Sequence, residues 1–233
     1  MLKISEIFLS LQGESTRSGR LCSFVRLFGC NLSCVWCDTK YADDVAGAGV
    51  PGSSPSSMSV PAVIAAVEDL YSGSDEVSAA EKENRLVEIT GGEPLLQPDT
   101  AALCSGLLSL GFEVMAETNG SLDIGALPPG VRRVVDVKCP GSGAGGSFLM
   151  DNINHLGPAD ELKFVTASLD DAVWAAEFCA RHALAGRCPI IFSPASPSLT
   201  CEALADWMVK TRPAGVRLGI QLHKLIWGDR RGV

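Results

Sequence analysis

Short runs of apolar and β-branched residues recur along the chain and predict β-strands. They lie at residues 4–9, 23–27, 86–90, 113–117, 133–138, 162–166, 190–193 and 216–222. Segments with helical spacing fall between most of them, at 61–71, 98–110, 172–184 and 199–210. Strands that alternate with helices predict a parallel sheet with any site at the carboxyl ends of its strands. About six such units are too few for a closed eight-stranded barrel, so we expect an α/β fold of the partial, open TIM-like barrel type.

The length of the chain favours one domain over residues 1–233, interrupted by two segments with loop composition. Residues 41–59 are rich in Gly, Ser and Pro, and residues 72–84 are polar and acidic. Both are expected to be solvated connections. The first directly follows a group of cysteines, a position from which it could also act as a lid.

Composition narrows the classes of function. A hydrophobic fraction of 46% and a charged fraction of 20% are ordinary for a globular protein with a full core. The net charge of −8 predicts no general attraction to nucleic acid or to anionic membranes. No apolar run approaches the ~20 residues of a membrane-spanning helix, and the first ten residues lack the apolar core of a signal peptide. We therefore expect a cytoplasmic protein.

Cysteine usage is unusual for such a protein. Nine cysteines are an odd number in a reducing compartment, which favours metal binding over disulfides. Cys30, Cys34 and Cys37 lie within eight residues, in a segment with loop composition. Three thiolates can hold a four-iron cluster and leave one iron open to a further ligand. A structural zinc site would need a fourth ligand, for which Cys22 is the nearest candidate.

Polar or glycine-containing turns follow several of the predicted strands. Residues 90–94 read Thr-Gly-Gly-Glu-Pro, where glycine permits close backbone approach and Glu93 can accept hydrogen bonds from an ammonium group. Residues 117–120, 136–138 and 193–196 end later strands. Taken alone, each is a common strand-ending turn.

The Cys-x3-Cys-x2-Cys spacing, with Trp36 before the last cysteine, resembles the radical S-adenosylmethionine superfamily. The resemblance implies a [4Fe–4S] cluster on Cys30, Cys34 and Cys37, with S-adenosylmethionine on the open iron and an electron breaking its S–C5′ bond. It also implies a groove for that cofactor formed by residues of the cysteine loop and the strand-ending turns. These residues are Trp36, Cys37, Asp38, Gly92, Glu93, Glu117, Asn119, Asp136, Val137, Lys138, Ser193, Pro194, Ala195 and Ser196.

Further motifs, before and after the segments that resemble the superfamily, point to one family within it. They are residues 10–15 (Ser-Leu-Gln-Gly-Glu-Ser), 24–26 (Phe-Val-Arg), 38–39 (Asp-Thr), 221–224 (Gln-Leu-His-Lys) and 227–228 (Trp-Gly). Together they resemble the 7-carboxy-7-deazaguanine synthase family over nearly the whole chain. The resemblance implies a homodimeric lyase that converts 6-carboxy-5,6,7,8-tetrahydropterin to 7-carboxy-7-deazaguanine and ammonia, on the route to queuosine and related 7-deazapurines. It further implies Mg²⁺, catalytic use of S-adenosylmethionine, and an electron donor such as flavodoxin or ferredoxin.

The family motifs suggest individual roles for their residues. Gln12 and Glu14 suit the polar edge of a pterin, and Arg26 suits its carboxylate. Taken alone, Glu14 could equally be solvated and Arg26 a buried ion-pair partner. Thr39 is expected on Mg²⁺, with capping of the following turn as its alternative role. Residues 221–228 are expected to form a final strand that brings His223 and the terminal carboxylate to the substrate, and no residue stands out as an obligatory proton donor. The expected substrate-binding set is Leu11, Gln12, Gly13, Glu14, Arg26, Thr90, His223 and Val233.

Two other classes share some of these features. An activase of glycyl-radical enzymes has the cysteine triad and the Gly-Gly-Glu-Pro turn, but it acts on a polypeptide and does not require the outer motifs. A zinc-binding interaction module would explain only the cysteines. Iron analysis separates the zinc module from the other two.

Overall fold

The computed structural model describes residues 1–43, 54–72, 85–228 and 230–232. In these residues, nine strands form one sheet in the order β3-β1-β2-β4-β5-β6-β7-β8-β9. The strands are β1 (Leu2–Leu11), β2 (Leu21–Leu27), β3 (Ser56–Met58), β4 (Leu86–Gly91), β5 (Glu113–Thr118), β6 (Arg132–Asp136), β7 (Glu161–Thr166), β8 (Ile190–Pro194) and β9 (Val216–Leu218).

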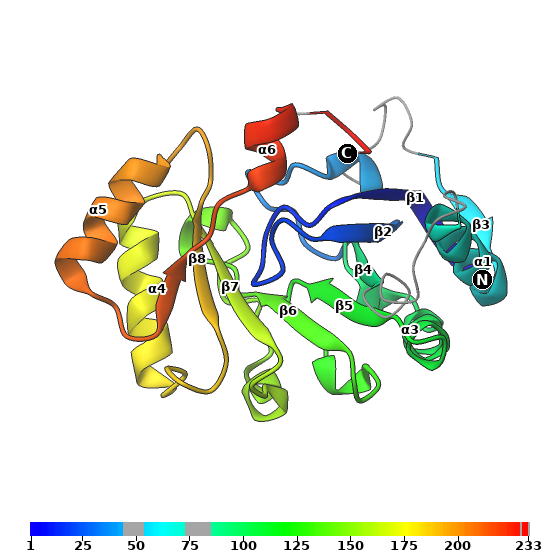
Figure 1. The fold of residues 1–233 in the computed structure, drawn as a ribbon. Helices are drawn as coiled ribbons and strands as arrows, with labels where there is room; N and C mark the ends of the chain where they lie inside the picture. The colour runs from blue at the N-terminus through cyan, green and yellow to red at the C-terminus, as the bar shows by residue number, and fades with distance from the viewer. Residues whose placement is uncertain (44–53, 73–84, 229, 233) are drawn as a thin grey trace.

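Every neighbouring pair from β2 to β9 is parallel, whereas β1 is antiparallel to both β2 and β3. The sheet curves without closing, because β3 and β9 remain its two edges (Figure 1). The expected open, partial barrel is therefore confirmed. The pairing of β1 with β2 is a hairpin, which the strand–helix alternation did not indicate.

Helices cover the convex side of the sheet (Figure 1). They are α1 (Val60–Tyr71), α3 (Thr100–Ser109), α4 (Leu169–Arg181) and α5 (Cys201–Thr211), and α6 (Leu222–Trp227) lies beyond the last strand. Helices α1, α4 and α5 begin at Ser59, Ser168 and Thr200, whose side chains accept a hydrogen bond from a backbone N–H of the first turn. Short 3-10 turns occupy Lys40–Ala42, Pro94–Leu96, Ile124–Ala126, Pro140–Ser142 and Met150–His155.

Two sequence-based expectations need correction. Residues 221–228 do not form a strand: the ladder ends where Gly219 N–H donates to the carbonyl of Phe192, and residues 222–227 then form the helix α6. In the segment expected to be a loop at 41–59, residues 56–58 form β3, which pairs with the start of β1. Residues 44–53 and 73–84, the greater part of the two expected loops, lie outside the described residues, as do Asp229 and Val233.

Alternation along the strands separates the two faces of the sheet. In β4, Val87 and Ile89 pack under the helices, whereas Leu86, Glu88 and Thr90 belong to the concave face. At the amino end of the concave face, Leu86 joins a small apolar layer with Cys22, Met115 and Val134. Polar side chains follow this layer toward the carboxyl ends of the strands, and they position the site.

The turn between β1 and β2 crosses the concave face (Figure 1). Thr16 donates its backbone N–H and its hydroxyl to Glu161 at the start of β7, and Arg17 pairs with Glu113 at the start of β5 at 2.8 Å. Gln12 donates to Glu88 of β4. The turn therefore links β7 to β4 and β5, from which β7 is separated by β6 in the sheet.

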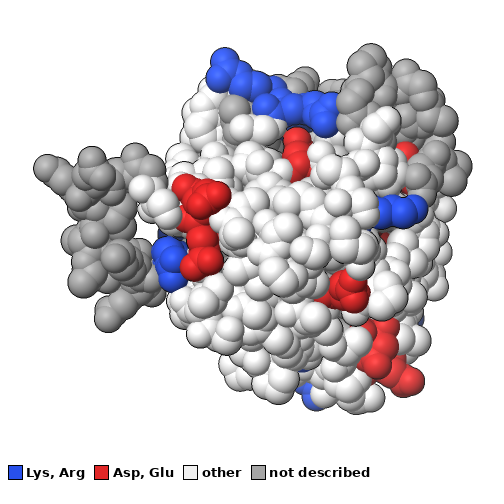
Figure 2. Space-filling model, turned by 90° about the vertical axis from the view of Figure 1, so that its right-hand side faces the viewer, with Lys and Arg blue, Asp and Glu red and all other residues white. Residues whose placement is uncertain are grey.

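None of the helices in the described part of the chain has the length and apolar character needed to cross a bilayer. On the face shown in Figure 2, basic and acidic side chains are scattered over a largely uncharged surface.

Candidate active site

A cavity of about 260 Å³ lies at the carboxyl ends of the parallel strands. Strands β1, β2 and β4 to β7, the cysteine loop and α6 all contribute to its lining. Most residues expected at the site line this one cavity. They are Leu11, Gln12, Gly13, Glu14, Arg26, Cys30, Cys34, Trp36, Cys37, Asp38, Thr39, Thr90, Gly92, Glu117, Asn119, Asp136, Lys138, Ala195, Ser196 and His223.

Four other expected residues lie behind the lining. Val137, Ser193 and Pro194 are buried without reaching the cavity. Glu93 is fully buried, and its carboxylate accepts hydrogen bonds from Thr118 Oγ1 at 2.8 Å and from the backbone N–H of Asn119 at 2.7 Å. Burial raises the pKa of Glu93, and the hydrogen bond from Asn119 is the largest of the effects that oppose the rise. Glu93 thus stabilises the turn after β5 through these hydrogen bonds.

Two backbone hydrogen bonds hold the cysteine loop to neighbouring 3-10 turns. Gly29 N–H donates to the carbonyl of Ala42, and Val35 N–H donates to the carbonyl of Ser142. Gly92 passes directly below the loop, where an added Cβ would lie 2.8 Å from Cys30 Cβ. Glycine at this position therefore allows the backbone after β4 to approach the first cysteine.

The three thiols suit a cluster. Cys30, Cys34 and Cys37 all line the cavity, and no group of three His, Cys, Asp or Glu side chains in the described residues is arranged around a single ion. Thiolates on a four-iron cluster each bind a different iron, so they need to surround the space without converging on one point. Burial raises the pKa of the Cys30 and Cys34 thiols, and Lys138 opposes the rise at Cys34.

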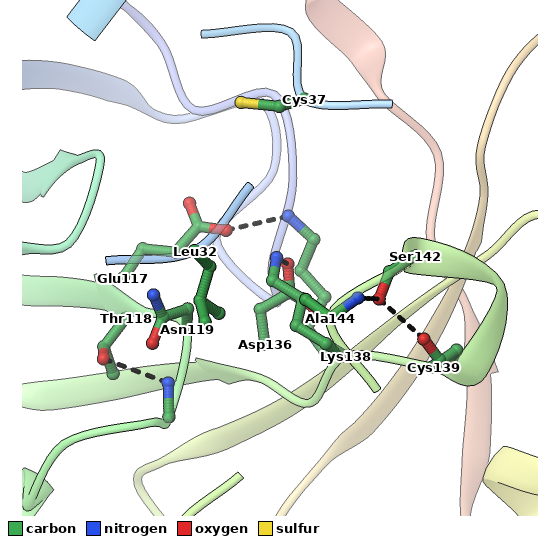
Figure 3. A network of polar contacts seen from close by, with 12 residues as sticks. Leu32, Cys37, Glu117, Thr118, Asn119, Asp136, Lys138, Cys139, Ser142 and Ala144 are labelled. Carbon is green, nitrogen blue, oxygen red and sulfur yellow. Dashed lines mark hydrogen bonds and ion pairs between the residues drawn. The ribbon is translucent and has the colours of Figure 1, made fainter. Parts of the chain in front are cut away.

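The turns after β5 and β6 lie side by side opposite this loop. Figure 3 shows Glu117, Asn119, Asp136 and Lys138 there, with Cys37 on the facing segment. Asn119 Nδ2 lies 3.9 Å from Cys30 Sγ and donates to Asn31 at 3.0 Å. Lys138 Nζ pairs with Asp136 Oδ2 at 2.6 Å, and Asp136 Oδ1 is buried without a hydrogen-bond partner. The polar groups of these turns, among them the unpartnered Asp136 oxygen, suit the charged methionine and ribose parts of S-adenosylmethionine.

Charged side chains that the sequence reading did not single out form the floor of the cavity. Lys163 of β7 pairs with Glu117 at 2.8 Å and with Glu14, and it is 9% exposed. Burial opposes the charge on Lys163, but Glu117 and Glu14 outweigh it and raise its pKa. Glu88 of β4 lies beside this group and accepts from Gln12. Strand alternation could have identified Glu88 as a cavity residue. Val87 and Ile89 face the helices, so Glu88 between them must face the cavity.

Arg26 of β2 and His223 of α6 both line the cavity. Arg26 Nε pairs with Glu6 at 2.7 Å, and Glu6 also accepts from the hydroxyl of Tyr41. The described residues form no other hydrogen bond to the Arg26 side chain, so its two terminal nitrogens remain for a ligand. The ion-pair role and the ligand role expected for Arg26 are therefore compatible.

His223 of α6 packs against Gly13, where an added Cβ would lie 2.9 Å from its Cγ. Leu222 N–H donates to the carbonyl of Gly13, and Gln221 Nε2 donates to Glu14 at 2.7 Å. Burial lowers the pKa of His223, and Glu14 opposes the change. The helix that replaces the expected strand therefore still brings this histidine to the cavity.

An open parallel sheet with three cysteines of this spacing above its carboxyl ends defines a radical S-adenosylmethionine enzyme. Residues 25–135 match the model of the Radical SAM superfamily. The chain is 39% identical to the 7-carboxy-7-deazaguanine synthase of Koribacter versatilis, over 97% of each chain. It is also 39% identical to that of Chlorobaculum tepidum, over 100% of this chain and 97% of the relative. The chain belongs to the 7-carboxy-7-deazaguanine synthase family, whose members are lyase-type radical enzymes that use a [4Fe–4S] cluster and S-adenosylmethionine.

A solved structure shares the fold. QueE from Escherichia coli superposes with a TM-score of 0.73 at 24% identity, over 95% of this chain and 94% of that chain. At this identity the likeness shows the architecture alone.

Proposed function

We propose that the chain converts 6-carboxy-5,6,7,8-tetrahydropterin to 7-carboxy-7-deazaguanine with release of ammonia. The observation that carries the proposal is one cavity lined both by the three cysteines and by Arg26, Glu14 and His223. A polar, carboxylated bicyclic ring would contact these charged groups while lying beside the cofactor. The relatives named 7-carboxy-7-deazaguanine synthase support the same assignment.

The residues of the chain bind and orient the two small molecules. When bound to the three cysteines, the cluster together with S-adenosylmethionine supplies the radical that starts the reaction. Arg26 holds the substrate carboxylate through a charge-assisted hydrogen bond. Glu14 and His223 face the ring, and Phe8 and Phe24, stacked with centroids 5.1 Å apart, contribute apolar surface to the cavity. The walls of the cavity limit access of water to the reacting ring.

An anaerobic assay of the reconstituted wild-type protein with the carboxylated tetrahydropterin tests the function. We expect one 7-carboxy-7-deazaguanine and one ammonia per pterin consumed, with little net loss of S-adenosylmethionine. The Cys34→Ala variant is the matched control and should form neither product. Wild-type protein that cleaves S-adenosylmethionine but leaves the pterin unchanged would contradict the proposal.

We also assign Thr39 to a Mg²⁺ site. Thr39 lines the cavity next to Asp38, whose carboxylate pairs with Lys224 at 3.0 Å. One hydroxyl is a weak site by itself, because Mg²⁺ keeps several waters and relies on substrate oxygens. The contact between Thr39 Oγ1 and Cys37 Sγ, at 3.6 Å, places that hydroxyl beside the cluster loop.

Mg²⁺ is therefore expected to bind only when the carboxylated pterin is present. Calorimetry on cofactor-loaded protein should show Mg²⁺ binding with the pterin and none without it. Thr39→Val should weaken the pterin-dependent binding by about tenfold, whereas Thr39→Ser should preserve it. Tight Mg²⁺ binding in the absence of pterin would contradict this assignment.

Two further proposals follow from membership of the family. The chain acts as a homodimer, and it receives its electron from a small redox protein such as flavodoxin or ferredoxin. Sedimentation and reduction of the cluster by each donor would test them.

A further inference from the structure

Three carboxylates, Glu14, Glu88 and Glu117, lie at the floor of the cavity. Among the described residues, Glu88 is the one of the three that forms no ion pair. It is 4% exposed, and its Oε2 accepts a hydrogen bond from Gln12 Nε2. Gln12 is itself held in place, because its Oε1 accepts from the backbone N–H of Glu14 at 2.9 Å. No other hydrogen bond or ion pair to the Glu88 carboxyl is formed by the part of the chain that the structure describes.

The neighbouring cations are already bound to other acids. Lys163 Nζ contacts Glu14 and Glu117, and Lys138 contacts Asp136. The groups that surround Glu88 are Glu14 from the β1–β2 turn, Glu117 from β5, Lys163 from β7 and the Cys22 thiol from β2. Two carboxylates thus share one ammonium, and a third negative charge there would be buried without an ion-pair partner of its own.

The electrostatic balance agrees with this geometry. Burial raises the pKa of Glu88 well above its ordinary value, and repulsion from Glu117 adds to the rise. The hydrogen bond from Gln12 and the charge of Lys163 act in the opposite direction without cancelling it.

We propose that Glu88 is held as a neutral carboxylic acid whose O–H donates a hydrogen bond to the pterin, which makes Glu88 a specificity-determining residue of the reaction proposed above. Because Gln12 fixes Oε2 as an acceptor, Oε1 carries the proton. A neutral acid pairs with a carbonyl oxygen or an unprotonated ring nitrogen, whereas a carboxylate pairs with an N–H group. The proton on Glu88 therefore decides which edge of the pterin faces the floor of the cavity.

Replacing Glu88 with glutamine and with alanine distinguishes the neutral acid from the carboxylate. Glu88→Gln supplies an N–H₂ donor to the cavity and an acceptor to Gln12, so pterin affinity should stay within about threefold of wild type. Glu88→Ala removes the donor and leaves the Gln12 amide unpaired, so affinity should fall by about tenfold or more. Cluster content and S-adenosylmethionine binding should be unchanged in both. Equal losses in Glu88→Gln and Glu88→Ala would show that the carboxylate form is the one used, and no loss in Glu88→Ala would show that Glu88 does not contact the ligand.

Glu117→Gln is the matched control, because it makes the same change at a carboxylate paired with Lys163. It should weaken pterin binding even though Glu88→Gln does not. Infrared spectra provide a readout that needs no substrate. The C=O stretching band of a protonated carboxyl should be present in wild type and Glu117→Gln and absent in Glu88→Gln. Persistence of the band in Glu88→Gln would assign the proton to another group and overturn the inference.

The pH dependence of the free energy of unfolding should also reveal the proton on Glu88. The pKa of Glu88 is raised on folding from an ordinary value of 4.5, so its contribution to stability is lost as pH rises above about 4.5 toward the folded value. Glu88→Gln has no such titration, so its stability relative to wild type should increase with pH over that range. A difference that is independent of pH would contradict a buried proton on Glu88.

Failure of this inference is distinguishable from failure of the proposed function. If wild-type protein forms the product and Glu88→Gln fails as Glu88→Ala does, only the role of Glu88 is wrong. If wild-type protein does not bind the pterin, the proposed function fails, while the infrared band and the stability profile still test the proton.

Discussion

Replacing any one of Cys30, Cys34 and Cys37 with alanine should reduce cleavage of S-adenosylmethionine to background. These three cysteines share one loop above the cavity, and each would bind a different iron of the cluster. Loss of one thiolate leaves a cluster iron without its protein ligand, in a cavity that has no other cysteine in its lining. Iron and sulfide content and the formation of 5′-deoxyadenosine measure the effect.

Cys22→Ala and Cys139→Ala are the controls for this expectation. Both cysteines are fully buried, Cys22 in the apolar layer below the cavity and Cys139 in the core beneath α4. They behave as small apolar residues, so alanine should cost stability and spare the cluster. Loss of iron from either variant, with the fold intact, would show that the ligands were assigned wrongly.

Lys163→Met should have the largest effect among substitutions at the floor of the cavity. It would leave Glu14 and Glu117 buried without their shared ammonium, and breaking a buried ion pair in this way costs about 3–5 kcal/mol. Denaturant unfolding under anaerobic conditions should show the loss of stability, and pterin affinity should fall with it.

Two comparisons show whether this loss is electrostatic. The double variant Lys163→Met/Glu117→Gln removes one of the two abandoned charges, so it should recover part of the lost stability. Lys210→Met, on the exposed surface of α5, makes the same substitution without a partner acid and should change stability by less than about 0.5 kcal/mol. A double variant no more stable than Lys163→Met would refute the electrostatic explanation.

The elements that the sequence predicted well are those with a strong apolar pattern. β4, β5 and β7 are recognisable from their buried, β-branched or aromatic positions, and the capping Ser168 marks the start of α4. The cysteine loop and the turn at Gly92 are recognisable because their chemistry depends on residue type and short spacing. All of these features are local in the chain.

The features that the sequence missed depend on contacts between distant residues. Glu88 and Lys163 are charged residues with apolar neighbours in their strands, and only the curvature of the sheet brings Lys163 to Glu14 and Glu117. Glu93 fits the expected motif, yet its carboxylate is engaged by the turn after β5, 26 residues away. The helix α6 was missed because it spans only six residues, Leu222–Trp227, and an apolar pattern in so short a segment does not distinguish a helix from a strand.

The turn that crosses the concave face has a consequence for how the protein folds. Its residues are among the first to be synthesised, but their partners come much later: Thr16 bonds to Glu161, 145 residues away, and Glu14 to Gln221, 207 residues away. Contacts between residues so far apart in the chain form slowly, because a long loop must be closed first. Local strand–helix units can therefore assemble before the cavity exists. We therefore expect catalytic competence to be acquired at the end of folding, when the amino-terminal turn and the carboxyl-terminal helix meet.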